Sequence, residues 1–285
     1  MQILREVVAR CQEAHIAVLP VKGVVTSHLL YDDVAERPLA DVDVRVRRRD
    51  LPGFRRMARD AGWTCLRVTL SYHNVVYAFP PLSLDVEVQI GPPGLCALSV
   101  DDMLSRAATI ELAPSLHVLV PEIHDHAVLL TVNAFKDKIA TASAHALADL
   151  ERVVEHPSFV QDVFLERVIG ARVWTLTWLV ARWMDEHRGA RGWRAIRQAL
   201  ERRDGLRWAY ASLFERLLDR GQAAQLPMRL LARCAADGRG MQARALLAAF
   251  ARDTERFLRR HLTRPGASAA EHDPRTSGRD DDRRG

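Results

Sequence analysis

One short stretch, RPLADVDVRV at residues 37–46, sets the expectations for the whole chain. In its second half valines alternate with polar residues, which is the period-two pattern of a strand with one buried and one solvated face. Asp41 and Asp43 are therefore expected to point to the same side. Aspartate is disfavoured in strands, so two of them at this spacing indicate a use for their charge. Their Cα atoms should lie about 6.5 to 7 Å apart, a span that two carboxylates close around one Mg²⁺ or a pair. The alternative is an ordinary solvated edge strand.

The residues before this stretch predict a binding site for an anion. Residues 16–21 read as a short apolar strand that ends at Lys22 and Gly23. Residues 24–31 then have the spacing of a helix. A glycine at such a junction lets backbone amides at the helix N-terminus approach a phosphate group.

Strand, glycine turn, helix and Asp-x-Asp strand, in this order, resemble the core of the DNA polymerase β-like nucleotidyltransferase superfamily. More closely, VLPVKGVVTSHLLY at residues 18–31 and ERPLADVDVRV at residues 36–46 resemble a bacterial family of uncharacterised nucleotidyltransferases. Its members carry a Lys-Gly turn, then an arginine, then Asp-x-Asp. The resemblance runs from about residue 15 to residue 155. It implies a transferase that depends on Mg²⁺ or Mn²⁺ and moves a nucleoside monophosphate from an NTP, ATP among them, to an acceptor hydroxyl.

The resemblance also implies roles for individual residues. Lys22 and Gly23 would bind the β and γ phosphates, and Arg37 stands at the family's arginine. Asp41 and Asp43 would be the catalytic metal ligands. Two features depart from the expected pattern. Superfamily relatives often have Gly-Ser at the turn, so the role of Lys22 is inferred from position alone, and Arg45 stands where the family usually has an apolar residue.

A third carboxylate on a neighbouring strand completes the metal site in the resembled superfamily and can act as the base for the attacking hydroxyl. The stretch LDVEVQI at residues 84–90 alternates again and places Asp85, Glu87 and Gln89 on one face. Either Asp85 or Glu87 is the expected third catalytic carboxylate, with Asp85 slightly favoured as the metal ligand. The family often reads acidic-x-His here, so Glu87 occupies the position where a histidine is common. The alternative is a charged edge strand.

A second motif of the resembled family is a helix after the sheet with a basic residue and a later aspartate. The stretches FKDKI at residues 135–139 and HALADL at residues 145–150 match it. The resemblance implies that Lys136 and Lys138 contact the triphosphate and that Asp149 fixes a helix or contacts the ribose. Ordinary surface charges are the equally weighted alternative.

These patterns predict an α+β fold: a small mixed β-sheet nucleotidyltransferase core with flanking helices, followed by an all-helical domain. After the Asp-x-Asp strand, the predicted strands are residues 63–70, 74–79 and 82–90, which complete a mixed five-stranded sheet. The expected divisions are residues 1–115 for the α+β domain, 116–262 for the helical domain and 263–285 for a disordered tail.

His124 and Asp125 fall within a predicted helix. We expect one histidine to pack on the sheet and Asp125 to be solvated, and a metal phosphohydrolase site is the weaker alternative.

Composition narrows the function classes. The chain has 285 residues and a formal charge of +5, from 41 basic and 36 acidic residues, which permits anionic partners. Nucleic acid is possible but not favoured, because no aromatic residues are interleaved with the arginines. The N-terminus lacks the apolar core of a signal peptide, no segment is long enough to span a membrane, and the four cysteines are scattered. These features favour a cytoplasmic protein.

Two function hypotheses follow from these observations. The first is the nucleotidyltransferase itself, with an NTP as one partner and an unidentified acceptor, either a peptide, a protein or a small molecule, as the other. The second is a nucleotidyltransferase fold that binds or regulates without catalysis, and retention of both aspartates argues against it. If the carboxylates crowd together without metal, Asp43→Asn should leave the metal-free protein as stable as wild type or slightly more stable.

Overall fold

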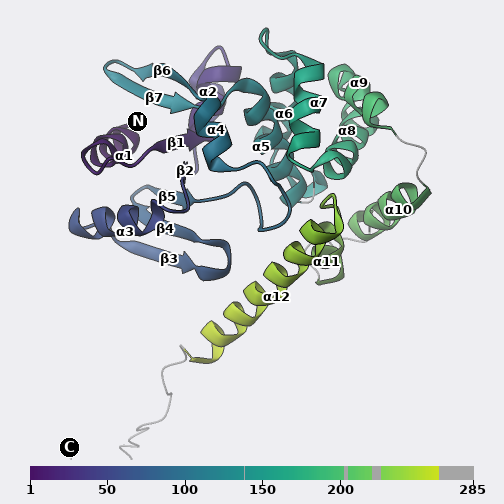
Figure 1. Ribbon diagram of the computed structural model, residues 1–285. Helices are drawn as coiled ribbons and strands as arrows, with labels where there is room; N and C mark the ends of the chain where they lie inside the picture. The colour runs from purple at the N-terminus through teal and green to yellow at the C-terminus, as the bar shows by residue number, and fades with distance from the viewer. Residues whose placement is uncertain (138, 202–204, 220–225, 263–285) are drawn as a thin grey trace, which may run out of the picture.

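The structure, a computed structural model, describes residues 1–137, 139–201, 205–219 and 226–262 (Figure 1). Two of the predictions fall outside these residues: the phosphate contact of Lys138 and the disordered tail at 263–285. Within the described part, the chain has the predicted α+β fold, a mixed β-sheet with flanking helices followed by helices alone.

Five strands form the central sheet in the order β1-β2-β5-β4-β3. Their bounds are Val18–Val21 for β1, Val42–Val46 for β2, Cys65–Thr69 for β3, Asn74–Phe79 for β4 and Leu82–Glu87 for β5. The β2 and β5 strands pair in parallel, and the other three pairs are antiparallel. This confirms the predicted mixed five-stranded sheet.

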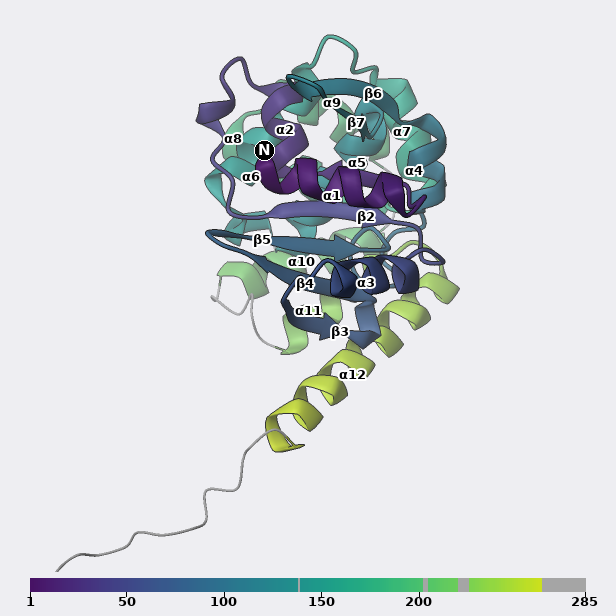
Figure 2. The same cartoon turned by 90° about the vertical axis from the view of Figure 1, so that its left-hand side faces the viewer.

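The two faces of the sheet differ in chemistry because side chains alternate along each strand. Val42, Val44 and Val86 lie on a buried face that packs against α1 (Gln2–Glu13) and α3 (Leu51–Asp60). Figure 2 shows these two helices in front of the sheet and α5 (Ile123–Lys136) behind it. The face toward α5 carries the charged side chains of β2 and β5.

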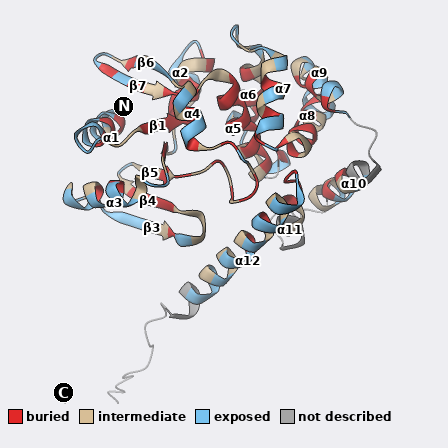
Figure 3. Ribbon diagram, in the orientation of Figure 1, coloured by how far each residue is buried: buried red, intermediate tan, exposed pale blue. Residues whose placement is uncertain are grey.

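Helix α5 is the centre of the helical region. Eleven of its fourteen residues are buried, so it is covered by other parts of the protein on nearly all sides. Figure 3 shows most of this helix in the colour of buried residues. Helices α6 (Ala144–Glu155), α7 (Gln161–Gly170) and α8 (Trp174–Arg188) pack directly against α5. The remaining helices are α2 (Gly23–Leu30), α4 (Val100–Arg106), α9 (Arg191–Leu200), α10 (Gly205–Asp219), α11 (Leu226–Arg233) and α12 (Arg239–Leu262). None of the helices in the described ranges is both long and apolar enough to cross a bilayer.

The structure contains a hairpin that was not predicted from the sequence. A hairpin of β6 (Ala108–Ala113) and β7 (Leu116–Val120) precedes α5, and β7 packs against β1. Its turn contains Pro114 and Ser115, and Ser115 has a φ of 62°. The expected domain boundary after residue 115 therefore falls inside this hairpin, and the division into domains stays a prediction.

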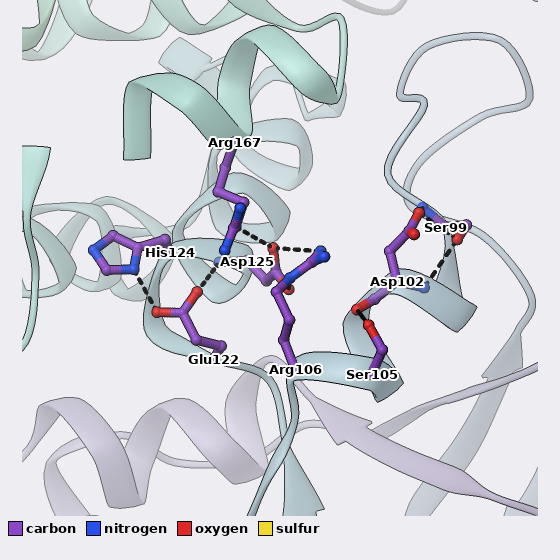
Figure 4. A network of polar contacts seen from close by, with 8 residues as sticks. All are labelled: Ser99, Asp102, Ser105, Arg106, Glu122, His124, Asp125 and Arg167. Atoms are coloured by element: carbon purple, nitrogen blue, oxygen red, sulfur yellow. Dashed lines mark hydrogen bonds and ion pairs between the residues drawn. The ribbon is translucent and has the colours of Figure 1, made fainter. Parts of the chain in front are cut away.

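Asp125 is not solvated, contrary to the prediction; it is the centre of a buried ionic network (Figure 4). Its side chain is 0% exposed and accepts hydrogen bonds from Arg106 at 2.9 and 3.1 Å. Arg167 lies 3.5 Å away on the other side, so the carboxylate joins α4, α5 and α7. His124 bonds to Glu122 and accepts from the amide of Val160 at 2.8 Å. Because Asp125 is bonded to two arginines and His124 to Glu122 and Val160, the two side chains stabilise the packing of the helices and are not arranged as metal ligands.

Helix α12 returns to the sheet at the far end of the chain. Glu255 accepts hydrogen bonds from the amides of Leu70 and Ser71 at 3.0 and 3.2 Å, which caps the short 3₁₀ helix η2 (Leu70–Tyr72) between β3 and β4. Gly94 contacts the other flank of α12: with a φ of 81°, a Cβ at this residue would lie 2.5 Å from the backbone nitrogen of Ala245. Only glycine allows this approach.

Gly94→Ala should therefore loosen α12. Alanine at positive φ costs about 1 to 2 kcal/mol by itself, and the overlap with Ala245 adds to that cost. Gly62→Ala is the matched control, because Gly62 has a φ of 75° with nothing within 4 Å of the added Cβ. We expect faster proteolysis of α12 and a lower melting temperature in Gly94→Ala than in Gly62→Ala. Equal effects in the two variants would show that α12 does not depend on this contact.

Candidate functional site

Three aspartates converge where β2 and β5 lie side by side. In the parallel register of these strands, Asp43 is directly opposite Asp85, and Asp41 immediately precedes β2. One carboxylate oxygen from each residue lies within 4.8 Å of the others. We call Asp41, Asp43 and Asp85 the carboxylate triad; it is the single group of this kind found in the described part of the chain.

The electrostatics of the triad fit a divalent cation. Burial, together with the charges of Asp43 and Glu87, raises the pKa of Asp85 to about 6. Burial and Asp43 also raise the pKa of Asp41. Both shifts mean that negative charge is crowded and only partly compensated, and a cation bound between the carboxylates relieves this repulsion. Carboxylate oxygens are the ligands that Mg²⁺ and Mn²⁺ prefer.

Lys22 contributes the first compensating charge. Its Nζ lies 2.5 Å from Oδ1 of Asp43, whose side chain is 4% exposed. Burial lowers the pKa of Lys22, but the charges of Asp43 and Glu87 outweigh it, so the pKa is raised and the side chain stays cationic. The backbone of Lys22 has a φ of 52° and a ψ of −135°, a conformation that costs a residue other than glycine of order 1 to 3 kcal/mol. This turn aims the ammonium group at Asp43.

Gly23 and Arg37 lie together beside the first turn of α2. A Cβ on Gly23 would be 3.0 Å from Cδ2 of Leu39 and 3.6 Å from Nη1 of Arg37, so glycine allows Leu39 and Arg37 to approach the turn closely. The first amides of a helix have no partner within it and form a favourable environment for phosphate. We call Lys22, Gly23 and Arg37 the phosphate-binding turn, after the role that the sequence predicts for them.

Asp149 holds the guanidinium group of Arg37 in place. The carboxylate is 1% exposed and accepts hydrogen bonds from Nε and Nη2 of Arg37 at 3.0 to 3.2 Å. It also accepts one from the hydroxyl group of Tyr31 at 2.7 Å. The structure thus places Asp149 behind Arg37, where it orients the guanidinium group and has little surface left for a ribose.

Helix α2 is also fixed to α5. Oγ1 of Thr26 lies 3.0 Å from Nε2 of His126, and both side chains are completely buried. Burial lowers the pKa of His126 to about 4, so the imidazole is neutral at physiological pH. This contact sets the position of the phosphate-binding turn against the core.

Glu87 has a different partner from Asp85. Its carboxylate lies 2.6 Å from Nη2 of Arg45, which is 2% exposed on the adjacent strand β2. Burial raises the pKa of Glu87, but Arg45, Lys22 and Lys136 outweigh it, so the pKa is lowered. Glu87 is therefore the counter-ion of a buried arginine, and the departure from an apolar residue at Arg45 has a physical reason. Asp85 is the carboxylate that faces Asp43.

The other predicted residues lie near the triad to different degrees. Lys136, at the end of α5, shares a cavity with Asp85 and Glu87, and burial together with Lys22 lowers its pKa. The sequence analysis missed Arg67 and Arg252, which line the same cavity. No local pattern links β3 to α12, so the sequence offered no signal for this pair.

Comparison with known proteins gives one extensive match. The model of a family described as uncharacterised nucleotidyltransferase matches residues 1–187. No curated protein matches the sequence. Among solved structures, the antibiotic-resistance factor ANT(2'')-Ia is similar with a TM-score of 0.41 at 12% identity, covering 75% of this chain and 95% of that chain. A tRNA-processing enzyme in its apo form has a TM-score of 0.31 at 14% identity, covering 92% and 78%.

The triad predicts opposite effects for two aspartates in the metal-free protein. Asp85→Asn removes a charge that burial and repulsion disfavour, so at pH 7.5 it should be more stable than wild type by about 1 to 2 kcal/mol. The folded pKa of Asp85 is above its unfolded value, so wild type loses stability as pH rises from about 4 through 6. The advantage of the variant should therefore disappear toward pH 4. Denaturant unfolding in EDTA measures both quantities.

Asp43→Asn should instead be less stable than wild type by about 2 kcal/mol, because it leaves Lys22 without its buried partner. This reverses the expectation from sequence, which did not include Lys22. Asp60→Asn, at a carboxylate that is 63% exposed on α3, is the control and should be neutral. A loss of stability in metal-free Asp85→Asn at pH 7.5 would contradict the electrostatic description of the triad.

Proposed function

Since the chain belongs to the uncharacterised nucleotidyltransferase family, we propose that it transfers a nucleoside monophosphate from an NTP to the hydroxyl group of an acceptor, with pyrophosphate as the second product. The family identifies the general chemistry. The roles of individual residues, the metal and the acceptor belong to the proposal.

The observation that carries the proposal is the convergence of the carboxylate triad beside the phosphate-binding turn. Asp41, Asp43 and Asp85 offer oxygens within 4.8 Å of one another, and Lys22 reaches Asp43 from the turn itself. Mg²⁺ or Mn²⁺ held by the triad would supply neutralisation of the charge on the transferring phosphoryl group. A phosphate site next to a carboxylate site is the arrangement that nucleotide transfer needs.

The phosphate-binding turn would hold the β and γ phosphates of the NTP. The amides of Gly23 and Val24 at the start of α2 would donate to phosphate oxygens, and Arg37, oriented by Asp149, would add a cation that is already in position. Lys22 is placed between this turn and the triad. Its ammonium group would move from Asp43 to the triphosphate when the nucleotide binds, which leaves Asp43 available.

A second candidate function is binding or regulation without catalysis, and one observation favours it. The ammonium group of Lys22 neutralises Asp43 at 2.5 Å, where it competes directly with a metal ion. If Lys22 stays there when a nucleotide is present, the triad has only two carboxylates free. Measurements of turnover therefore discriminate between the two functions.

Nucleotide transfer is tested by incubating the protein with each α-labelled NTP, Mg²⁺ or Mn²⁺, and a cell lysate as the source of acceptors. Labelled product should appear with wild type, and Asp41→Asn, Asp43→Asn and Asp85→Asn should each reduce its rate by orders of magnitude. Melting temperatures of the same samples show whether each variant is folded.

Two further variants act as controls for this assay. Asp60→Asn should keep full activity, because its carboxylate lies on the other side of the sheet from the triad. Glu87→Gln should be less stable than wild type, because buried Arg45 loses its counter-ion, and it should keep metal binding. Full activity in folded Asp41→Asn and Asp43→Asn would refute the catalytic proposal.

A further inference from the structure

A basic groove opens beside the triad, between the β3–β4–β5 side of the sheet and α12. It consists of two adjacent lobes with volumes of about 220 and 160 Å³, which share Tyr72, Pro92, Lys136 and Arg252 in their walls. Asp85 lies in the wall of the larger lobe. Together the lobes are near the lower end of the volumes of small-molecule sites, about 300 to 1,000 Å³.

The groove lies on the opposite side of the triad from the phosphate-binding turn. The order of strands places the turn at the end of β1, the triad on β2 and β5, and the groove along β5, β4 and β3. In phosphoryl transfer the attacking and leaving oxygens are roughly in line. If pyrophosphate leaves on the β1 side, the attacking hydroxyl must therefore approach from the side of this groove.

Cationic side chains outnumber carboxylates in the walls of the groove: the cations are Arg67, Lys136, Arg233, Arg252 and Arg256, and the carboxylates are Asp85, Glu87 and Asp253. In the portions of the chain that the structure describes, neither Arg67 nor Arg252 forms an ion pair with a carboxylate. Burial, together with the charges of Arg256 and Arg67, lowers the pKa of Arg252. In addition, Nε2 of Gln89 is a buried donor without a hydrogen-bond partner in the structure. An acceptor group with negative charge would satisfy these donors.

The position of Arg252 is fixed before any ligand binds. The guanidinium group of Arg252 lies over the ring of Tyr72 at 4.2 Å, and Arg233 donates a hydrogen bond to the hydroxyl group of Tyr72 at 3.0 Å. Glu255 and Gly94 hold α12 against the sheet. Helix α12 lies outside the residues 1–187 that the family model matches, so the family match does not cover this wall of the groove.

Resting on the proposed function, we propose that the basic groove binds the acceptor, and that the acceptor is a small hydroxyl compound that also carries a phosphate or carboxylate group. Arg67 and Arg252 bind the anionic group and direct the hydroxyl toward Asp85. The hydroxyl oxygen bonds to the α-phosphorus, the bond from this phosphorus to the bridging oxygen breaks, pyrophosphate leaves, and the hydroxyl proton passes to solvent. A single-stranded nucleic acid fits less well, because Arg252 already occupies one face of the Tyr72 ring, on which a base would otherwise stack.

The first test measures anion binding by the full chain without NTP. Glycerol 3-phosphate, glycerate and glycerol are titrated by calorimetry, with a short random RNA as a fourth ligand. At least one of the two anions should bind, glycerol should not, and the stronger of the anions identifies the charged group. Arg67→Gln and Arg252→Gln should each weaken this binding at least tenfold. Arg59→Gln, at a side chain that is 75% exposed on α3, is the control and should have no effect.

The second test separates the groove from the phosphate-binding turn. Arg37→Gln should reduce the rise in melting temperature caused by Mg²⁺ and an NTP and keep anion binding, and Arg252→Gln should do the opposite. Absence of anion binding, loss of anion binding in Arg37→Gln alone, or binding of RNA but of neither anion would each overturn the acceptor proposal. Absence of NTP binding in wild type would instead overturn the proposed function, whatever the anions do.

Discussion

The parallel pairing of β2 with β5 is the constraint on which the rest of the structure depends. It puts Asp43 opposite Asp85 and, on the other face, Val44 opposite Val86. A shift of one residue would turn the carboxylates into the apolar core and the valines into the site, so burial of the valine face under α1 and α3 fixes the register. The energy that holds the site together is therefore hydrophobic and lies on the side of the sheet away from the chemistry.

The charges that this register brings together need compensation. Lys22 neutralises Asp43 and Arg45 neutralises Glu87, so two of the four carboxylates near the centre of the sheet have a cation of their own. Among the residues that the structure describes, Asp41 and Asp85 have no comparable partner, and their raised pKa values reflect that difference. The charges of Asp41 and Asp85 stay uncompensated, which favours binding of a cation. The pairing of Asp43 and Glu87 with cations limits the loss of folding free energy that four close carboxylates would cause.

Features carried by local patterns could be predicted from the sequence. The alternation around Asp43 and Asp85, the glycine turn at Gly23 and the mixed sheet were all predicted and found. Long-range contacts could not be predicted, because no periodicity encodes them. Because Lys22 pairs with Asp43, the effect expected for Asp43→Asn on the stability of the metal-free protein changes sign. Asp125, which was predicted to be solvated, is buried. The groove was missed for the same reason, since β3 and α12 meet only in the folded chain.

Binding of Mn²⁺ to the triad tests the central claim most directly. Free Mn²⁺ is measured by electron paramagnetic resonance while the full chain is titrated with a non-hydrolysable NTP analogue present. The account predicts that Asp41→Asn, Asp43→Asn and Asp85→Asn each weaken Mn²⁺ binding at least about tenfold, with Glu87→Gln and Asp60→Asn close to wild type. Folded triad variants that bind Mn²⁺ as wild type does, or a wild type that binds none, would contradict it.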